Sequence, residues 1–205
     1  MKNLINLNRF TTLPILLDFL EKQKLVLLDP ISWEDKNDSE VILEYKRKAK
    51  IKSVFALCFT DSGETIHHWK TFAKGNNGCC IEFNANKLTE IFDKTPGIRH
   101  GNVNYKSINE EMQPFKLKDF PFIKRLPYKF EREYRVIWEG KSTKPYFEIK
   151  VPIEIIRRIT FSQQMPESVF NTVKFNLIKN YPSLKNKINH STIYRNELWI
   201  NYFKK

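Results

Sequence analysis

The chain has 205 residues, 41% of them hydrophobic and 28% charged, and its formal net charge is +12. This composition is typical of a folded globular protein and excludes a disordered chain, and the length favours a single domain over residues 1–205. No apolar run approaches the roughly 18 residues that cross a bilayer, and residues 1–16 lack a signal-peptide pattern, so we expect a cytoplasmic protein without a membrane partner.

The net charge indicates the kind of partner, and the cysteines indicate whether disulfides or a metal site are present. The excess of Lys and Arg favours a polyanion, and nucleic acid is the partner that we expect; a Lys-rich solvated surface is the alternative. Cys58, Cys79 and Cys80 cannot all pair, and the apolar run around Cys79 predicts reduced, buried thiols. No CxxC motif occurs and no histidine has a cysteine at ligand spacing, so we expect no zinc or other bound metal.

Hydrophobic patterns predict short alternating elements along the chain. A helix is expected from residue 13, because Pro14 fits a first turn and leucines recur at helical spacing up to residue 20. The other expected helices are 39–50, 65–74, 85–92 and 166–180. The expected strands are 25–28, 53–59, 79–83, 102–105, 130–138, 146–151, 158–162 and 192–202.

Two further features of this pattern define the expected fold. Residues 107–127 are polar, Lys-rich and broken by Pro, which predicts a long irregular excursion of the kind that often carries function. No glycine-rich phosphate loop is present. Because the elements interleave without regular βαβ units, we predict an α+β fold with a central, mostly antiparallel mixed sheet of about six strands, flanked by helices.

The expected strand at 130–138 carries the first candidate site. Side chains alternate between the two faces of a strand, so Glu131, Glu133 and Arg135 share one face, whereas Phe130 and Trp138 share the other and should be buried. Neighbouring carboxylates raise each other's proton affinity, and an arginine opposes this. We therefore take the three charged residues as catalytic candidates; a solvated face with cross-strand ion pairs is the alternative.

Two other segments carry candidate binding residues. Trp69, on the expected helix 65–74, is either a core residue or a surface on which a base or nicotinamide stacks. His67 and His68 beside it could act as a general base, although the sequence provides no partner for either. Arg9 lies just before the first helix, where a guanidinium and a helix N-terminus together bind phosphate; a surface arginine is the alternative.

Three segments together resemble a bacterial family of uncharacterised domains related to abortive-infection phage-resistance proteins. The segments contain Arg9-Phe10 with Leu25–Leu28 and Asn37-Asp38-Ser39-Glu40; Cys58-Phe59-Thr60, Trp69, Phe72-Ala73 and Gly78-Cys79-Cys80-Ile81-Glu82-Phe83; and Lys124, Tyr128, Glu131, Glu133, Tyr134 and Arg135. Their order and spacing agree with the family over about residues 4–180. Ser39 and His68 depart from it, because the family has Pro and Met at these positions.

The start of the chain is also similar, more distantly, to ADP-ribosyltransferase-like folds, which include DNA-modifying toxins. There a basic residue of the first strand orders NAD and a late strand presents a catalytic glutamate, often as Glu-x-Glu, the form of Glu131-Arg132-Glu133. The resemblance implies an enzyme that uses NAD to modify a nucleic acid or a protein, and an antitoxin or regulatory protein as a further partner. It implies NAD binding by Arg9, Trp69, Lys124 and Tyr128. We take Glu131, Glu133 and Arg135 as the catalytic group, in which one of the two glutamates stabilises the oxocarbenium and the other, with Arg135, orients it.

Two other functions remain open at this stage. A metal-dependent nuclease would hold Mg²⁺ between Asp38, Glu131 and Glu133, although Arg135 and nearby lysines would compete with the ion. A basic sensor would bind nucleic acid without catalysis.

Overall fold

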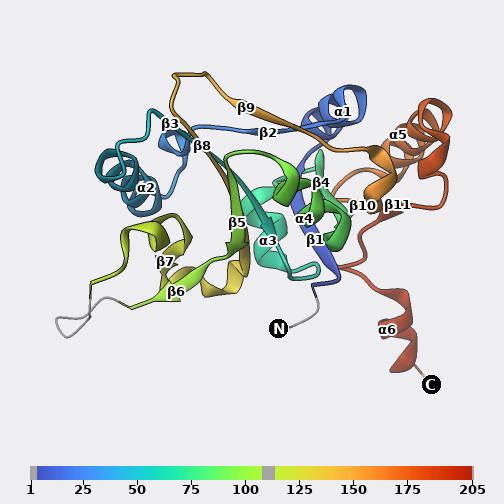
Figure 1. The fold of residues 1–205 in the computed structure, drawn as a ribbon. Coiled ribbons are helices and arrows are strands. Elements are labelled where there is room, and N and C mark those ends of the chain that lie inside the picture. Colours follow the sequence, from blue (N-terminus) through green and yellow to red (C-terminus); the bar gives the residue numbers. More distant parts are fainter. Residues whose placement is uncertain (1–3, 108–113, 205) are drawn as a thin grey trace.

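The structure is a computed structural model that describes residues 4–107 and 114–204. Helices and strands interleave along the chain (Figure 1). The strands are β1 (Asn6–Thr12), β2 (Lys24–Leu27), β3 (Ser53–Thr60), β4 (Gly78–Asn84), β5 (Ile98–Asn102), β6 (Asn104–Lys106), β7 (Ile123–Arg125), β8 (Glu133–Gly140), β9 (Phe147–Lys150), β10 (Ile156–Phe161) and β11 (Ile188–His190). The α-helices are α1 (Leu13–Lys22), α2 (Lys36–Lys48), α3 (Ile66–Phe72), α4 (Ala85–Lys94), α5 (Glu167–Asn180) and α6 (Glu197–Tyr202).

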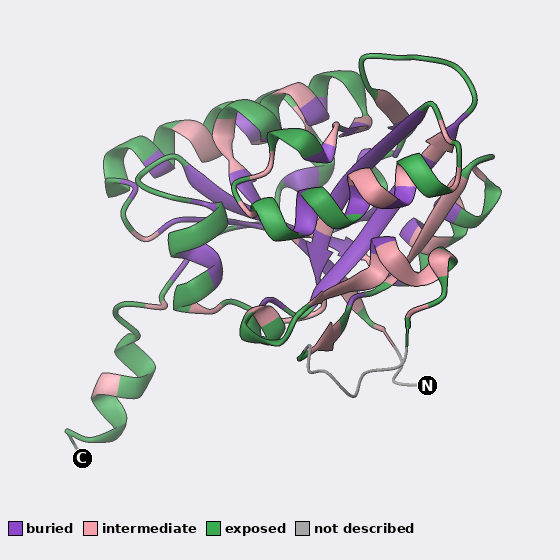
Figure 2. Ribbon diagram, turned by 90° about the vertical axis from the view of Figure 1, so that its left-hand side faces the viewer, coloured by how far each residue is buried: buried purple, intermediate pink, exposed green. Residues whose placement is uncertain are grey.

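The central sheet has seven strands in the order β11-β10-β4-β1-β3-β8-β5. Every neighbouring pair is antiparallel except β10 and β11. Figure 2 shows the buried strands in the middle, with helices that expose their outer faces around them. The predicted α+β class, with a mostly antiparallel mixed sheet flanked by helices, is therefore confirmed.

One face of this sheet carries the main hydrophobic core. Leucine and phenylalanine side chains of α1 and α4, such as Leu16 and Phe92, pack there against Leu7 of β1 and Val136 of β8, all of them fully buried. The strands alternate, so their other side chains point to the opposite face. That opposite face is where β3 and β8 place their polar residues.

The segment before β8 differs from the prediction. Strand β8 lies between β3 and β5 and Trp138 is buried, as expected. However, Leu126–Glu131 forms a 3₁₀ turn, η3, and the strand begins only at Glu133. Pro127 favours this turn, and Arg132 ends it in the left-handed region with a φ of 46°. Phe130 is therefore 71% exposed, and the prediction that it is buried on the strand is wrong.

Strands β1 and β3 are neighbours that pair at one position only, Asn8 opposite Thr60. Beyond it they separate, and Leu28, just after β2, takes over the pairing with β3 through two backbone hydrogen bonds to Ala56. The sheet is thus split along residues 57–59 of β3. Where two strands separate, their facing backbone N–H and C=O groups lose their ladder partners and can bind a ligand.

The C-terminal segment also differs from the prediction. Residues 192–202 were expected to form a strand, but the structure has helix α6, whose first turn is capped by the Asn196 side chain accepting from the Trp199 N–H. In Figures 1 and 2 the helix extends away from the rest of the chain. None of the helices in the described part is long and apolar enough to cross a membrane.

The predicted excursion at 107–127 contains the 3₁₀ turn η2 (Leu117–Phe122) and β7, and its residues 108–113 lie outside the described part of the chain. Strand β7 pairs in parallel with β6 in a separate two-stranded sheet. This pairing matters for the site because it places Lys124 beside the start of β8.

Candidate functional site

A cavity of about 640 Å³ lies in the gap between β1 and β3. Consecutive residues of both strands, 8–11 and 56–60, line it, which places it at the split edges rather than on one face of the sheet. Residues of the loop before α2, of α3 and of η3 complete the walls. The predicted site residues that line this cavity are Arg9, Lys124, Tyr128, Glu131 and Glu133.

Lys124 connects the two glutamates of the Glu-x-Glu pair. Its ammonium donates to Glu131 Oε2 at 2.6 Å and to Glu133 Oε2 at 3.3 Å. All three side chains are at most 9% exposed. Although Glu131 belongs to the turn η3 and not to the strand, the lysine thus brings it next to Glu133.

Arg135 holds Glu133 from behind the cavity wall. Its guanidinium donates to both Glu133 oxygens, Nε to Oε1 at 2.6 Å and Nη2 to Oε2 at 3.0 Å. It is fully buried and does not line the cavity, so it does not reach a ligand there. The structure therefore places Arg135 where it can orient Glu133 but does not touch a ligand in this cavity.

The carboxylates of this cluster differ in proton affinity. Burial raises the pKa of Glu133, but Arg135 and Lys124 outweigh this effect and lower the pKa to about 2. Burial also raises the pKa of Glu131, and there Lys124 opposes it only in part, so the net shift is upward. Burial lowers the pKa of Lys124, but its carboxylate neighbours overcome this and raise it, so Lys124 remains protonated.

Glu131 has the more accessible carboxylate. Lys124 donates to its Oε2, and none of the described residues donates a hydrogen bond to its Oε1. Glu133, in contrast, has both oxygens occupied by cations. Of the two glutamates, Glu131 is therefore the one with a carboxylate oxygen that no described residue occupies.

Arg9 lines another wall of the same cavity. Its Nη1 reaches across the split to the Cys58 carbonyl at 3.1 Å. It forms no ion pair with any residue in the described part of the chain, and burial lowers its pKa. A partly buried guanidinium without a carboxylate partner is a ready binding group for an anion such as phosphate.

Trp69 does not line the cavity. It packs on Phe10 and Cys80 in a small separate cluster, and its indole N–H donates to Glu64 Oε2 at 3.1 Å. Of the two roles expected for Trp69, its burial fits the core residue, and it does not reach this cavity. The aromatic side chains that do line the cavity include Trp33 and Tyr128, which contact the Arg135 and Lys124 cations respectively.

His68 is a buried residue that sequence reasoning left without a partner. Its Nε2 lies 3.0 Å from the Glu131 carbonyl, which can only accept, so Nε2 carries the proton. Its Nδ1 then accepts from the Thr65 hydroxyl at 2.6 Å, and its ring stacks on Phe10. His68 therefore ties the turn that carries Glu131 to helix α3, and burial lowers its pKa.

The metal-dependent alternative would need three carboxylates turned toward one ion. Asp38, Glu131 and Glu133 do lie together, because Lys124 is within 3.6 Å of an oxygen of each. However, that lysine and Arg135 occupy the space between them, and among the described residues no group of three acidic, His or Cys side chains is arranged to hold a metal. The cluster is thus an ion-pair network.

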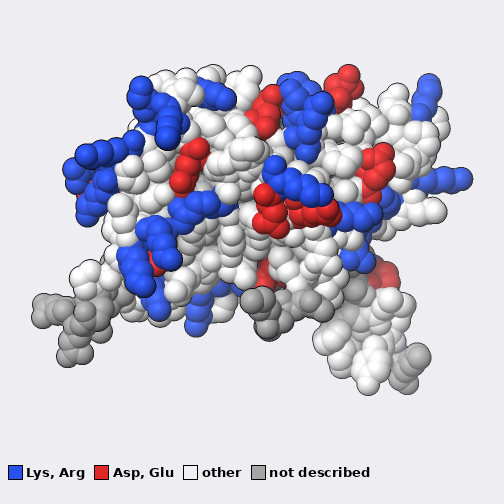
Figure 3. Space-filling model, viewed as in Figure 1, with Lys and Arg blue, Asp and Glu red and all other residues white. Residues whose placement is uncertain are grey.

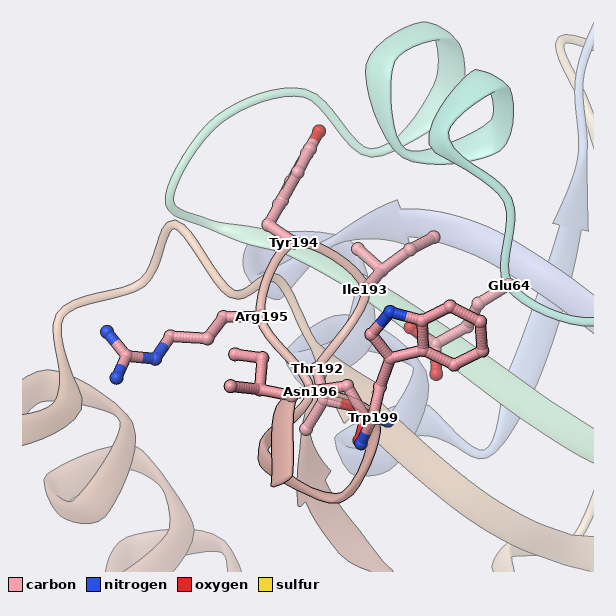
Figure 4. Close-up of a pocket in the computed structure, with 8 residues that line it drawn as sticks. Glu64, Thr192, Ile193, Tyr194, Arg195, Asn196 and Trp199 are labelled. Carbon is pink, nitrogen blue, oxygen red and sulfur yellow. The ribbon is translucent and has the colours of Figure 1, made fainter. Parts of the chain in front are cut away.

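A second cavity, of about 550 Å³, lies at the base of α6. Its charged residues are already paired: Glu64 accepts from Trp69 and Ser191, and Arg195 pairs with Glu197 at 2.6 Å. Figure 4 shows Arg195 pointing away from Trp199. Both donors to Glu64 bind its Oε2, so Oε1 remains free of described donors, but the described lining residues of this cavity include no cation without a carboxylate partner, which the first cavity has in Arg9.

The basic side chains of the protein do not form one patch on the face drawn in Figure 3. Lysines and arginines are spread over that face, with aspartates and glutamates between them. On this face, the excess of basic residues is thus not gathered in one place.

Sequence reasoning missed Asn8 and Trp33, which also line the cavity. A signal for Asn8 was present, since asparagine is depleted in strands and here stands between Leu7 and Arg9. Trp33 follows the Asp29-Pro30 turn, and an aromatic residue in such a loop is a candidate contact.

Comparison with known proteins adds one structural likeness. No protein-family model and no curated protein matches the chain. The structure of DarT from Thermus sp. 2.9 in complex with ADP-ribosylated single-stranded DNA aligns with a TM-score of 0.47 and 11% identity, over 94% of this chain and 96% of that one. At this level of similarity, function has to be inferred from the cavity itself.

Proposed function

We propose that the chain transfers ADP-ribose from NAD to a nucleic acid or protein, as a toxin-type enzyme of phage defence. The observation that carries this proposal is one cavity with an arginine that lacks a carboxylate partner in the described chain, Arg9, and a glutamate with an accessible oxygen, Glu131. The cavity volume of about 640 Å³ lies within the usual range for cofactor sites.

Arg9 provides the anion-binding part of the site. The diphosphate of NAD carries two negative charges, and a guanidinium binds such oxygens through two parallel hydrogen bonds. Binding would also give the Arg9 guanidinium the anionic partner that its buried position otherwise lacks. Tyr128 and Trp33 offer aromatic surfaces on which a planar ring can stack.

Glu131 provides the stabilisation of positive charge. Cleavage of the nicotinamide–ribose bond passes through an oxocarbenium-like transition state, and a carboxylate beside the ribose stabilises it. When Lys124, Arg135 and the three carboxylates are all ionised, the cluster has one excess negative charge, which favours a cationic centre in the cavity. Glu133 and Arg135 act through Lys124, which fixes the Glu131 carboxylate.

The transfer balances without an added oxidant or metal. The bond between ribose C1′ and the nicotinamide nitrogen breaks, and nicotinamide leaves with the bonding electron pair. A nitrogen or oxygen of the acceptor forms the new bond to C1′ and loses its proton to solvent. Nucleic acid is the favoured acceptor because of the net charge of +12, and the role in phage defence rests on the motifs around Trp69 and Glu131.

The experiment is incubation of the protein with NAD labelled in its adenylate phosphate, together with separate pools of RNA, DNA and cell protein. We expect nicotinamide release and transfer of label to one pool. Arg9→Gln should raise the KM for NAD, whereas Arg158→Gln, at an exposed ion pair with Glu82 on β4, should not. Tight binding of nucleic acid with no nicotinamide released would instead support the non-catalytic sensor.

A further inference from the structure

Asn8 lies where β1 and β3 meet, in a row of polar residues that crosses the sheet. Asn8 is opposite Thr60, and Thr60 is opposite Glu133. Residues paired across neighbouring strands point to the same face, so the three side chains lie side by side, and all three line the cavity. Asn8 therefore belongs to the wall that also carries the carboxylate cluster.

In the Asn8 side chain, Nδ2 donates a hydrogen bond, whereas Oδ1 accepts none from the described residues. Its Nδ2 donates to the Ser62 carbonyl at 2.7 Å, and this fixes the orientation of the amide, since the reverse orientation would place two acceptors together. Its Oδ1 is buried and accepts no hydrogen bond from the described residues. Asn8 as a whole is only 6% exposed. A buried acceptor of this kind is destabilising unless a water or a ligand supplies the donor, and an acceptor in a cavity wall is placed to exchange one for the other.

We propose that Asn8 Oδ1 accepts a hydrogen bond from the carboxamide NH₂ of nicotinamide and so selects NAD over dinucleotides without that group. An amide NH₂ only donates, which suits a position where Asn8 can only accept. A ribose hydroxyl would suit it less well, because it brings lone pairs that need donors of their own. Thr60 Oγ1, next in the row, accepts from the Ser62 N–H and provides a second acceptor beside Asn8.

This assignment rests on the proposed function. It also explains why nicotinamide, the leaving group, would bind near the negatively charged cluster. Nicotinamide bound at Asn8 lies in the same row as Glu133, close to the excess negative charge of the cluster. The pyridinium ring is cationic before cleavage and neutral afterwards. The Asn8 contact therefore holds the ring at the place where its positive charge is favoured.

The test compares two probes in three proteins. The probes are carba-NAD, whose glycosidic bond resists cleavage, and ADP-ribose, which lacks nicotinamide. The proteins are the wild type, Asn8→Leu, and Asn6→Ala as the control, since Asn6 lies two residues away on β1 and contacts Arg157 at the surface. We expect Asn8→Leu to weaken carba-NAD binding about tenfold and to leave ADP-ribose binding within about twofold.

The outcomes separate this inference from the proposed function. If the wild type binds neither probe, the proposed function fails and the inference with it. If it binds both and Asn8→Leu retains full affinity for carba-NAD, the inference alone is overturned. Should Asn8→Leu lose ADP-ribose as well, the comparison is repeated with Asn8→Ala, which adds no bulk. In the wild type, nicotinamide should displace carba-NAD at about tenfold lower concentration than nicotinic acid, and equal displacement would also overturn the assignment.

Discussion

Arg135 and Asp38, which are 97 residues apart in the chain, form a buried ion pair with two hydrogen bonds, Nη1 to Oδ1 at 2.9 Å and Nη2 to Oδ2 at 2.6 Å. Asp38 lies in the first turn of α2, and Arg135 lies near the start of β8, the strand between β3 and β5. The pair therefore joins helix α2 to the sheet directly behind the cavity. Since Arg135 also holds Glu133, the same contact fixes the back wall of the site.

Removing this cation should destabilise the fold strongly. Arg135→Met leaves the buried carboxylates of Asp38 and Glu133 without their main partner, and we expect the free energy of unfolding to fall by about 3–5 kcal/mol. Arg158→Met, which breaks the half-exposed pair with Glu82, should lower it by about 0–1 kcal/mol. Urea unfolding of both variants gives the comparison. Equal losses would contradict the role given to Arg135.

The ionised state of Glu133 should contribute to stability in a defined pH range. Its pKa of about 2 in the folded protein is below the ordinary value of about 4.3. A lowered folded-state pKa gives stability that is present above the ordinary pKa and is lost as the pH falls from there toward 2. Wild type should therefore exceed Glu133→Gln in stability at neutral pH, and the difference should shrink below about pH 4.3. A difference that stays constant down to pH 2 would show that Glu133 is not held as an anion.

Lys124 should set the acidic limb of the activity. Glu131 stabilises a positive charge only when it is ionised, and burial raises its pKa while Lys124 opposes that shift. Lys124→Met removes the opposing cation, so the pH below which nicotinamide release declines should move upward. Lys129→Met is the matched control, because the Lys129 ammonium lies over the Phe130 ring, outside the cluster. An unchanged pH profile in Lys124→Met would be inconsistent with Glu131 as the titrating group.

The contact between His68 and the Glu131 carbonyl should matter for turnover. His68→Phe keeps an aromatic ring against Phe10 but leaves that buried carbonyl without a donor, which destabilises by about 1–3 kcal/mol. We expect a lower kcat for nicotinamide release with little change in KM for NAD, because the turn that carries Glu131 is released. His67→Phe, at an exposed position on the same helix, should behave as wild type. Equal kcat values for the two variants would show that the contact between His68 and the turn of Glu131 does not matter for turnover.

Local patterns predicted most of the fold. Continuous apolar runs identified the core strands β3 and β4, and Pro14 marked the start of α1. The pattern failed at Phe130, where Pro127 and the left-handed Arg132 replace the first residues of the strand with a turn. It failed again at α6, where apolar residues such as Leu198 and Trp199 resembled a buried strand but lie exposed on a helix.

The candidate site was predictable only in part. Its charged residues are visible as residue types in motifs, whereas the cavity depends on how the strands pack in space. Glu131, Glu133 and Lys124 were identified from charge and from the resemblance, and they do meet in one cluster. The split between β1 and β3 depends on where strands separate in space, which no local pattern encodes. The burial of Arg135, the position of Trp69 outside the cavity and the unpaired oxygen of Asn8 all follow from that packing.

The most direct test of the account is nicotinamide release from NAD by Glu131→Gln, measured beside the wild type with the preferred acceptor present. Glutamine keeps the size of the side chain but removes the negative charge that faces the cavity. We predict a fall in rate of about 10²–10³-fold, with a melting temperature close to that of the wild type, because Glu131 contributes less than Glu133 to the ion-pair network. A folded Glu131→Gln protein that releases nicotinamide at the wild-type rate would contradict the central claim.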